Sequence, residues 1–359
     1  MAFDRDLALR QFIKIYSDAY DNLLDIIANK EAKGNVTNFQ ESLLKDVDNE
    51  LKKLDRVSQK YSVEVIPRSY KNSRDQVLKL FDDNNIGYDV ADNFGKVHKD
   101  AVKVLQENFY NNMQNAHSFI GRELRDKIRK AQLEVTEKKL TTGQTIKQTK
   151  ENLIRKLSNQ GIASYTDSAG RKWTLDRYAE MSARTVTAEA TNKGTFNQLR
   201  SMDRDLVQLS SHSSPCPVCA PLEGRVYSLS GNSERFPSIT NALPNRYGVI
   251  HPNCVHRFMP YVAELADNVE RDVKKSNRPF DEDPRTEKAK EAYRRNQKVN
   301  KLLRKEKRLT YRLKGLSKGT DEYKEVNDKL KKATSTRRDL ERKKSLEDAE
   351  FIDEIWRIK

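Results

Sequence analysis

The segments Cys216-Pro217-Val218-Cys219 and His251-Pro252-Asn253-Cys254-Val255-His256 decide how the central part of this chain folds. They contain all three cysteines of the 359-residue sequence, and the stretch from His212 to His256 contains three of its five histidines. A Cys-x-x-Cys pair followed by a second compact set of thiol and imidazole side chains is the ligand pattern of tetrahedral zinc. The spacing therefore predicts a small module that is stabilised by a metal ion.

Five side chains in these segments are candidate zinc ligands: Cys216, Cys219, His251, Cys254 and His256. A structural zinc ion takes four ligands, so one of the two histidines is either spare or lies outside the coordination shell and contacts one of the ligands. The spacing leaves both histidines open, because residues three apart share a side of a helical turn and residues two apart share a face of an extended segment. We predict a structural zinc site. The rival interpretation is a catalytic zinc with an open coordination position and His212 or Glu223 as general base.

The composition favours a mainly α fold. Hydrophobic residues make up 36% of the chain and charged residues 34%, so much of the structure must be solvated helix. Glycine and proline number only 13 and 10, which disfavours a turn-rich all-β protein. We expect assembly in a reducing cytoplasm, because the three cysteines do not suggest a disulfide framework and no apolar run approaches the roughly 18–20 residues that a membrane span needs.

Apolar residues at helical spacing predict most of the N-terminal half. One stripe runs from Leu9 to Ile27 and a second from Phe39 to Tyr61, with a break at Gly34, so the two segments should form an antiparallel hairpin. Pro67 is interpreted as an interruption, with a helix resuming around 76–81. Further helices are expected at about 96–137 and 175–199.

The pattern changes in the centre of the chain. Residues 206–210 read as a short strand that residues 226–229 could pair with, and 230–249 read as a loop. We therefore predict a helical domain at 1–200, consisting of helical hairpins, and a small zinc-stabilised α+β module at 201–266. A linker is predicted at 267–284 and a basic helical hairpin at 285–359.

The C-terminal segment carries nearly all of the excess positive charge. Residues 285–344 contain 23 Lys or Arg and 9 Asp or Glu, a net charge of +14, whereas the whole chain has +15. Such a segment suggests sequence-nonspecific contact with the DNA backbone. The alternative is a solvated helical hairpin, or one docked on an acidic partner.

Several polar side chains in the expected helices also invite a catalytic interpretation. Arg184, Thr185, Glu189 and Asn192 lie close together on one helix, and we interpret them as polar contacts between that helix and the zinc module. His98 and His117 have no ligand-type neighbour at helical spacing, so we interpret them as packed or surface histidines.

The run LSSHSSPCPVCAPLEG at 209–224, followed by HPNCVH at 251–256, resembles the phage minor capsid protein 2 family. Upstream GRKWTL at 170–175, YAEM at 178–181 and Arg184-Thr185 agree with it. The family looks allied to Mu F-type head morphogenesis proteins, which often have Cys-x-Cys where this chain has Cys254-Val255-His256. The resemblance therefore favours His256 as a ligand.

The resemblance is specific over about 170–261 and looser over the N-terminal helices. It implies a structural, non-enzymatic virion component that is assembled in a bacterial cytoplasm. Its partners would be portal and capsid proteins, and it would assist head assembly or the handling or ejection of packaged DNA. The rival functions are a zinc-dependent nuclease or hydrolase and a DNA-binding protein that acts outside the virion.

Overall fold

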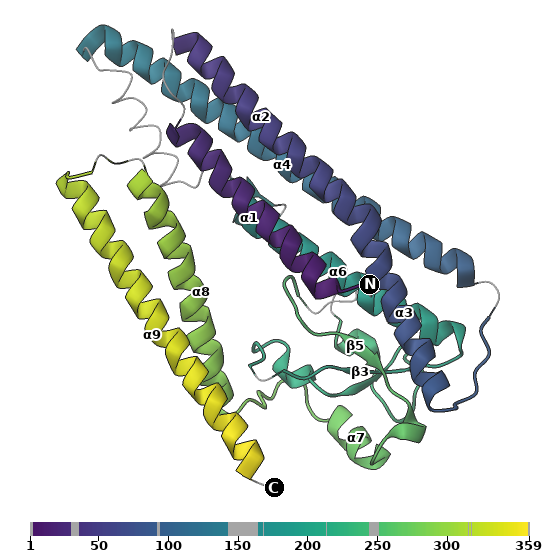
Figure 1. Cartoon of the computed structure of the whole chain (residues 1–359). Helices are drawn as coiled ribbons and strands as arrows, with labels where there is room; N and C mark the ends of the chain where they lie inside the picture. The colour runs from purple at the N-terminus through teal and green to yellow at the C-terminus, as the bar shows by residue number, and fades with distance from the viewer. Residues whose placement is uncertain are drawn as a thin grey trace. The chain divides into compact units, whose positions relative to one another are not determined.

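The computed structural model of the chain describes residues 3–29, 36–91, 94–142, 164–167, 169–212, 214–243, 251–314, 316 and 318–357. It is mainly helical, as the composition predicts (Figure 1). The α-helices are α1 (Arg5–Asn29), α2 (Val36–Lys60), α3 (Ile66–Asp83), α4 (Phe94–Thr142), α6 (Leu175–Ser201), α7 (Val269–Ser276), α8 (Glu287–Lys314) and α9 (Asp321–Arg357). The strands are β1 (Ser164–Thr166), β2 (Lys172–Thr174), β3 (Leu206–Leu209), β4 (Val226–Ser228) and β5 (Phe258–Pro260).

The chain divides into two compact units, each assembled from three stretches of sequence. The first contains residues 1–19, 51–119 and 175–284, and the second contains 20–50, 120–174 and 285–359. The cysteine and histidine residues singled out above all lie in the first unit, and the basic helices lie in the second. The domain boundaries expected from the sequence stay a prediction.

Helices α1 and α2 pair in the antiparallel manner that their apolar stripes predict. The rings of Phe12 and Tyr61 have centroids 4.4 Å apart, and the Tyr16 hydroxyl donates to the carbonyl of Leu54 at 3.1 Å. Near the other end, the Asn22 amide lies 3.5 Å from the Glu50 carboxylate. The residue numbers of the contacting partners rise along α1 while they fall along α2, so the two helices are antiparallel.

Pro67 does not separate two helices, contrary to the sequence interpretation. A π-helical turn, Tyr61–Val65, continues α2 directly into α3, and Pro67 occupies the first turn of α3. Proline has no N–H to donate, and it directly follows the π turn, where the regular i→i−4 ladder is already interrupted because the Ile66 N–H donates to the Tyr61 carbonyl. The helix that was expected around 76–81 therefore begins at Ile66.

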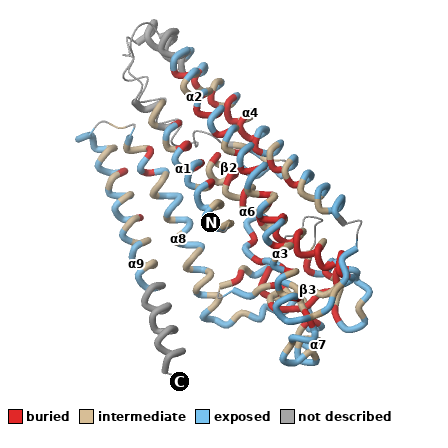
Figure 2. The backbone as a smooth tube through the Cα atoms, turned by 45° about the vertical axis from the view of Figure 1, so that its right-hand side comes forward, coloured by how far each residue is buried: buried red, intermediate tan, exposed pale blue. Residues whose placement is uncertain are grey.

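Helices α3 and α6 lie close together because small residues line their contact. A Cβ atom added to Gly194 would lie 2.5 Å from the carbonyl oxygen of Tyr70, so only glycine fits at this crossing. Beside it, the Ser73 hydroxyl donates to the carbonyl of Thr191 at 2.6 Å and lies 2.7 Å from the Thr195 hydroxyl. Buried residues concentrate along α3 and α6 and around β3 (Figure 2).

The sheet beneath these helices has the order β4-β3-β5, with both pairs antiparallel. Strands β3 and β4 pair as the sequence predicts. In the register of the sheet, Val207 of β3 is opposite Tyr227 of β4 on one side and Pro260 of β5 on the other. Strand β5 was not expected, because it has only three residues and ends in proline, which suits an edge strand. The core is shared with the helices: Phe81 of α3, Phe196 of α6 and Phe258 of β5 belong to one buried cluster.

The expected linker at 267–284 contains helix α7. The Asn268 side chain caps its first turn by accepting from the backbone N–H of Arg271 at 2.9 Å. Its last residue, Ser276, is buried and accepts from the backbone N–H of Val226 in β4 at 2.9 Å. The segment after β5 is therefore held against the sheet.

Helices α8 and α9 form the expected hairpin in the second unit. The Thr320 hydroxyl accepts from the N–H of Tyr323 at 3.1 Å and so caps the first turn of α9. Arg337 of α9 pairs with Glu306 of α8 at 2.8 Å. Tyr311 of α8 packs on Tyr20 at the C-terminal half of α1, with ring centroids 5.7 Å apart.

Candidate metal centre

The Cys-x-x-Cys segment forms a tight turn that presents two sulfur atoms together. The N–H groups of Cys219 and Ala220 donate to the carbonyl of Cys216 at 3.2 and 3.0 Å, and the Cys219 N–H also lies 3.4 Å from the Cys216 Sγ. The turn leads into a short 3-10 helix, Ala220–Leu222, whose apolar residues are buried. This packing fixes the direction of both cysteine side chains.

The second segment is a turn with the residue types that its geometry requires. The Cys254 N–H donates to the His251 carbonyl at 3.1 Å, with Pro252 and Asn253 between them. Proline at the second position and a residue with positive φ at the third are the signature of a type II turn, and Asn253 has φ 64°. The turn brings His251 and Cys254 to the same side.

The five predicted ligands lie close together as two overlapping groups of three. The Nε2 atom of His251 lies 3.2 Å from the Cys216 Sγ and 3.1 Å from the Cys219 Sγ. The Sγ atoms of Cys219 and Cys254 are 3.8 Å apart, and the Cys254 Sγ is 3.5 Å from the Nδ1 atom of His256. The donors thus form two triads that share Cys219.

These distances fit the donor separations of a zinc site. Bonds of about 2.3 Å to sulfur and about 2.0–2.1 Å to nitrogen place tetrahedral ligands about 3.8 Å apart for two sulfurs and about 3.6 Å apart for sulfur and nitrogen. The pair Cys219 and Cys254 matches the first value, and the sulfur–nitrogen pairs lie within about half an ångström of the second. Cys219 and Cys254 are buried, as a closed structural site requires.

The electrostatics of the cluster also favour a cation. The pKa of Cys216 is lowered to about 3, first by its hydrogen bond with Cys219 and then by His251. The hydrogen bond with Cys216 in turn raises the pKa of His251 to about 9. The pKa of Cys219 is raised by its hydrogen bonds with Cys216 and Cys254, because a further negative charge there is unfavourable. A divalent ion would relieve this repulsion by replacing protons.

Glu223 connects the cluster to its surroundings. One carboxylate oxygen lies 2.6 Å from the Nε2 atom of His256 and accepts from the backbone N–H of His212 at 2.9 Å. Burial acts to lower the pKa of His256, but the hydrogen bonds with Cys254 and Glu223 outweigh it and raise that pKa. The next residue, Gly224, has φ 65°, a conformation that favours glycine. Glu223 therefore orients His256, and its oxygen already has two donors.

Comparison with known proteins places the chain in a family. The sequence profile described as phage minor capsid protein 2 matches residues 5–342. The chain belongs to the phage minor capsid protein 2 family. A protein named "Structural protein" from Lactococcus phage LL-H is 26% identical over 108 residues, which make up 28% of this chain and 29% of that relative. No solved structure matches the chain.

Membership of the phage minor capsid protein 2 family identifies the chain as a structural protein of a phage virion. Among the helices in the described part of the chain, none is both long and apolar enough to span a membrane.

In this minor capsid protein 2 family member, the polar residues of α6 act separately. The Asn192 side chain accepts from the backbone N–H of Phe258 in β5 at 3.0 Å, which joins helix and module as expected. Arg184 binds Glu180 at 3.2 Å, and the Thr185 hydroxyl faces the sulfur of Met181 at 3.8 Å. Burial raises the pKa of Glu189 to about 7.

The two histidines outside the module are packed side chains. His117 is buried, with its Nε2 atom 2.9 Å from the Tyr16 hydroxyl. His98 is half-buried, and its Nδ1 atom lies 2.8 Å from the Tyr70 hydroxyl. Sequence reasoning considered Glu223 only as a catalytic base, because nothing in the sequence places it beside His256.

Proposed function

We propose that this chain is a structural minor capsid protein that associates with the portal region, assists head assembly and handles packaged DNA. The family match over residues 5–342 carries this proposal. The name of the Lactococcus phage relative, "Structural protein", supports a structural role. A zinc-stabilised module is the second part of the proposal, and DNA contact by the basic hairpin is the third.

Cys216, Cys219, Cys254 and His251 are our proposed zinc ligands, in a structural site. The Nε2 atom of His251 faces two of the three sulfurs, whereas His256 faces only Cys254. The other ring nitrogen of His251 lies 2.8 Å from the carbonyl of Pro252, the partner that orients a ligating imidazole. His256, held by Glu223, supports Cys254 from outside the coordination shell.

The two histidines can be distinguished by measuring zinc affinity in competition with a chromophoric chelator. His256→Ala should weaken zinc binding about 10–100-fold, the usual effect of losing a supporting group. His251→Ala should weaken it further, because a ligand itself is lost. His98→Ala is the matched control outside the cluster and should leave the affinity unchanged. The reverse order for His251 and His256 would contradict the assignment.

A zinc-dependent nuclease or hydrolase is the rival function. It needs an open metal position and a free general base. The Glu223 oxygen nearest the cluster already accepts from His212 and pairs with His256, which supports a structural role. A nuclease assay of the full chain with added zinc tests this. Activity that His212→Ala or Glu223→Ala abolishes would establish the rival.

The basic hairpin retains many exposed cations after its internal pairing. In α8 and α9, eleven exposed Lys and Arg side chains have no partner among the described residues, and these are Lys288, Lys298, Lys301, Arg304, Lys305, Arg308, Lys331, Lys332, Arg338, Arg342 and Lys343. Other cations are neutralised within the second unit, where Lys307 pairs with Asp21 and Lys314 with Asp25 of α1. The unpaired charges support contact with DNA phosphates.

Salt dependence tests the DNA contact. Lys301→Glu/Lys305→Glu should lower affinity for duplex DNA of any sequence and reduce the slope of log affinity against log salt by roughly 2. The matched control is Lys96→Glu/Lys99→Glu, which reverses two exposed charges at the start of α4. Equal effects of the two double variants would contradict a specific role of the hairpin.

Virion localisation tests the central assignment. Mass spectrometry of purified particles should detect the chain at low copy number, and cross-linking should connect it to the portal protein. Absence from particles would refute the assignment and favour a DNA-binding protein that acts outside the virion.

A further inference from the structure

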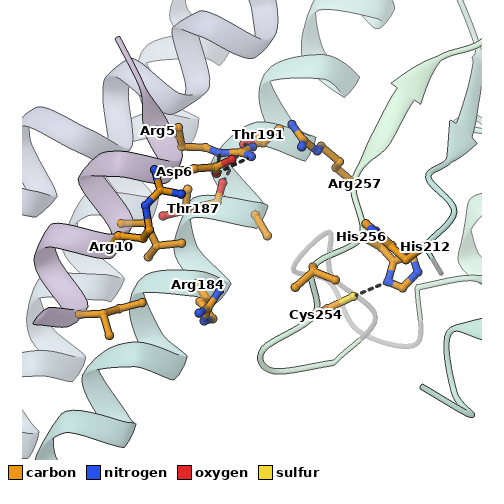
Figure 3. A pocket seen from close by; sticks show the side chains of 14 residues that line it. Arg5, Asp6, Arg10, Arg184, Thr187, Thr191, His212, Cys254, His256 and Arg257 are labelled. Atoms are coloured by element: carbon orange, nitrogen blue, oxygen red, sulfur yellow. Dashed lines mark hydrogen bonds and ion pairs between the residues drawn. The ribbon is translucent and has the colours of Figure 1, made fainter. Parts of the chain in front are cut away.

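A pocket of about 420 Å³ lies beside the Cys/His cluster in the first unit (Figure 3). Helix α1 contributes Arg5 and Arg10 to its lining, helix α6 contributes Arg184, and the turn after Cys254 contributes Val255 and Arg257. The volume lies within the range of about 300–1,000 Å³ that is typical of ligand pockets. We call it the arginine pocket.

The arginine pocket is strongly cationic. Asp6 is the sole acidic residue among its described lining residues, against four arginines. Burial acts to raise the pKa of Asp6, but its hydrogen bond to Arg5 and the charges of Arg257 and Arg10 outweigh this and lower it. Arg5 pairs with Asp6 and Arg184 with Glu180, so the charges of Arg10 and Arg257 remain without an acidic partner among the described side chains.

The arginines differ in what they already bind. Arg5 donates to Asp6 at 2.8 Å and to the Thr191 hydroxyl at 3.2 Å, so its guanidinium is engaged. Arg184 uses its Nε atom on Glu180. Within the described part of the chain, the side chains of Arg10 and Arg257 have no hydrogen-bond or ion-pair partner. These two guanidinium groups are therefore available to a ligand.

The pocket also has an apolar wall. Leu9 and Ile13 lie one helical turn apart on α1 and both line it. Val255 lines it as well and is 59% exposed, so its side chain is accessible to a ligand. Apolar side chains beside unpaired arginines suit a ligand that carries carboxylates next to aliphatic groups.

A second hollow of about 300 Å³ adjoins the arginine pocket and shares Arg5, Asp6, Thr191 and Arg257 with it. Its lining includes Ser69, whose buried Oγ atom has no hydrogen-bond partner in the described structure. Two adjoining hollows that share their arginines match an extended chain rather than a single small anion.

We propose that the arginine pocket binds an acidic peptide segment of another virion protein, with Asp or Glu carboxylates on Arg10 and Arg257 and aliphatic side chains on Leu9, Ile13 and Val255. Guanidinium groups bind carboxylates through paired, charge-assisted hydrogen bonds. A concave site with an apolar wall favours a peptide over duplex DNA, whose phosphates lie on a convex polar backbone. That the peptide belongs to a virion protein rests on the proposed function, whereas the peptide chemistry rests on the pocket alone.

Fluorescence anisotropy of the full-length protein tests the proposal, with a labelled peptide of repeated Glu-Leu-Asp units as probe. Arg10→Ala and Arg257→Ala should each weaken binding about tenfold or more, because each removes a charge-assisted pair. Arg56→Ala is the matched control, an exposed arginine of α2 without a described partner, and should leave binding unchanged. Val255→Asp alters an exposed side chain, so the fold should persist while binding is lost.

Three results would overturn the proposal. The first is no binding of the acidic peptide by the wild-type protein, and the second is equal binding by the arginine variants. The third is competition by duplex DNA: if DNA displaces the peptide from the wild-type protein and also from the Lys301→Glu/Lys305→Glu variant, the pocket is a DNA site. Failure to find the chain in virions would refute the proposed function and leave a positive peptide result standing.

Discussion

Acidification is expected to destabilise the folded protein through His117. Its ring is buried against Tyr16, and its Nδ1 atom lies 3.8 Å from the Asp55 carboxylate without a hydrogen-bond partner in the described structure. Burial lowers the pKa of His117 to about 4, although Asp55 partly opposes the shift. In the unfolded chain the pKa of histidine returns to about 6.5.

Proton linkage gives the sign and the size of the change in the free energy of unfolding. Between these two pKa values the unfolded state binds more protons than the folded state, so the free energy of unfolding falls as the pH falls. With pKa values of about 4 and 6.5, this one group should remove about 2 kcal/mol of stability between about pH 7 and pH 5.

The measurement is urea unfolding of the wild-type protein and His117→Gln at both pH values. The difference in stability between the two proteins should change by about 2 kcal/mol with pH, because the variant lacks the titrating group. His98→Gln is the comparison, since burial also lowers the pKa of His98 but the side chain is less buried, so a smaller change is expected. The same pH dependence in wild type and His117→Gln would refute the reasoning.

Three further substitutions test the packing around α6 by thermal or chemical unfolding. Asn192→Ala should cost about 1–3 kcal/mol, because the buried N–H of Phe258 loses its acceptor; no change would show that water replaces the bond. Gly194→Ala should destabilise by about 1–3 kcal/mol through the clash with the Tyr70 carbonyl, whereas the control Gly95→Ala meets no atom within 4 Å and should be neutral or slightly stabilising. Glu189→Gln should stabilise the protein above pH 7 by up to about 3 kcal/mol. Its folded pKa of about 7 exceeds the unfolded value, so stability is lost as the pH rises through that range; a variant that is less stable at pH 8 would contradict this.

Much of the helical part of the fold could be predicted, because apolar spacing reports one buried face. The stripes around Phe12 and Leu54 predict the antiparallel contact that the structure contains. The strand at 206–209 and its partner at 226–228 were also predicted, since alternation is visible even in short strands.

The remaining features depend on tertiary contacts that leave no local pattern. Helix α7 is eight mostly polar residues, and the cap at Asn268 and the buried Ser276 hold it in place. Pro67 was misread because a π-helical turn is not visible in a periodic pattern.

The candidate site shows the same division. The Cys-x-x-Cys and His-Pro-Asn-Cys turns are local, so the proximity of their cysteine and histidine side chains could be predicted from spacing. The support of His256 by Glu223 spans 33 residues, and the arginine pocket joins α1 to a turn some 250 residues later. Only the folded chain brings these groups together.

The metal content of the purified full-length protein tests the central claim most directly. Elemental analysis should find a single zinc ion per chain, and removing it with a chelator should lower the thermal unfolding temperature of the first unit. Cys219→Ser, which changes the sulfur that both triads share, should lose the metal. A metal-free protein whose unfolding is insensitive to chelator and to added zinc would contradict the account.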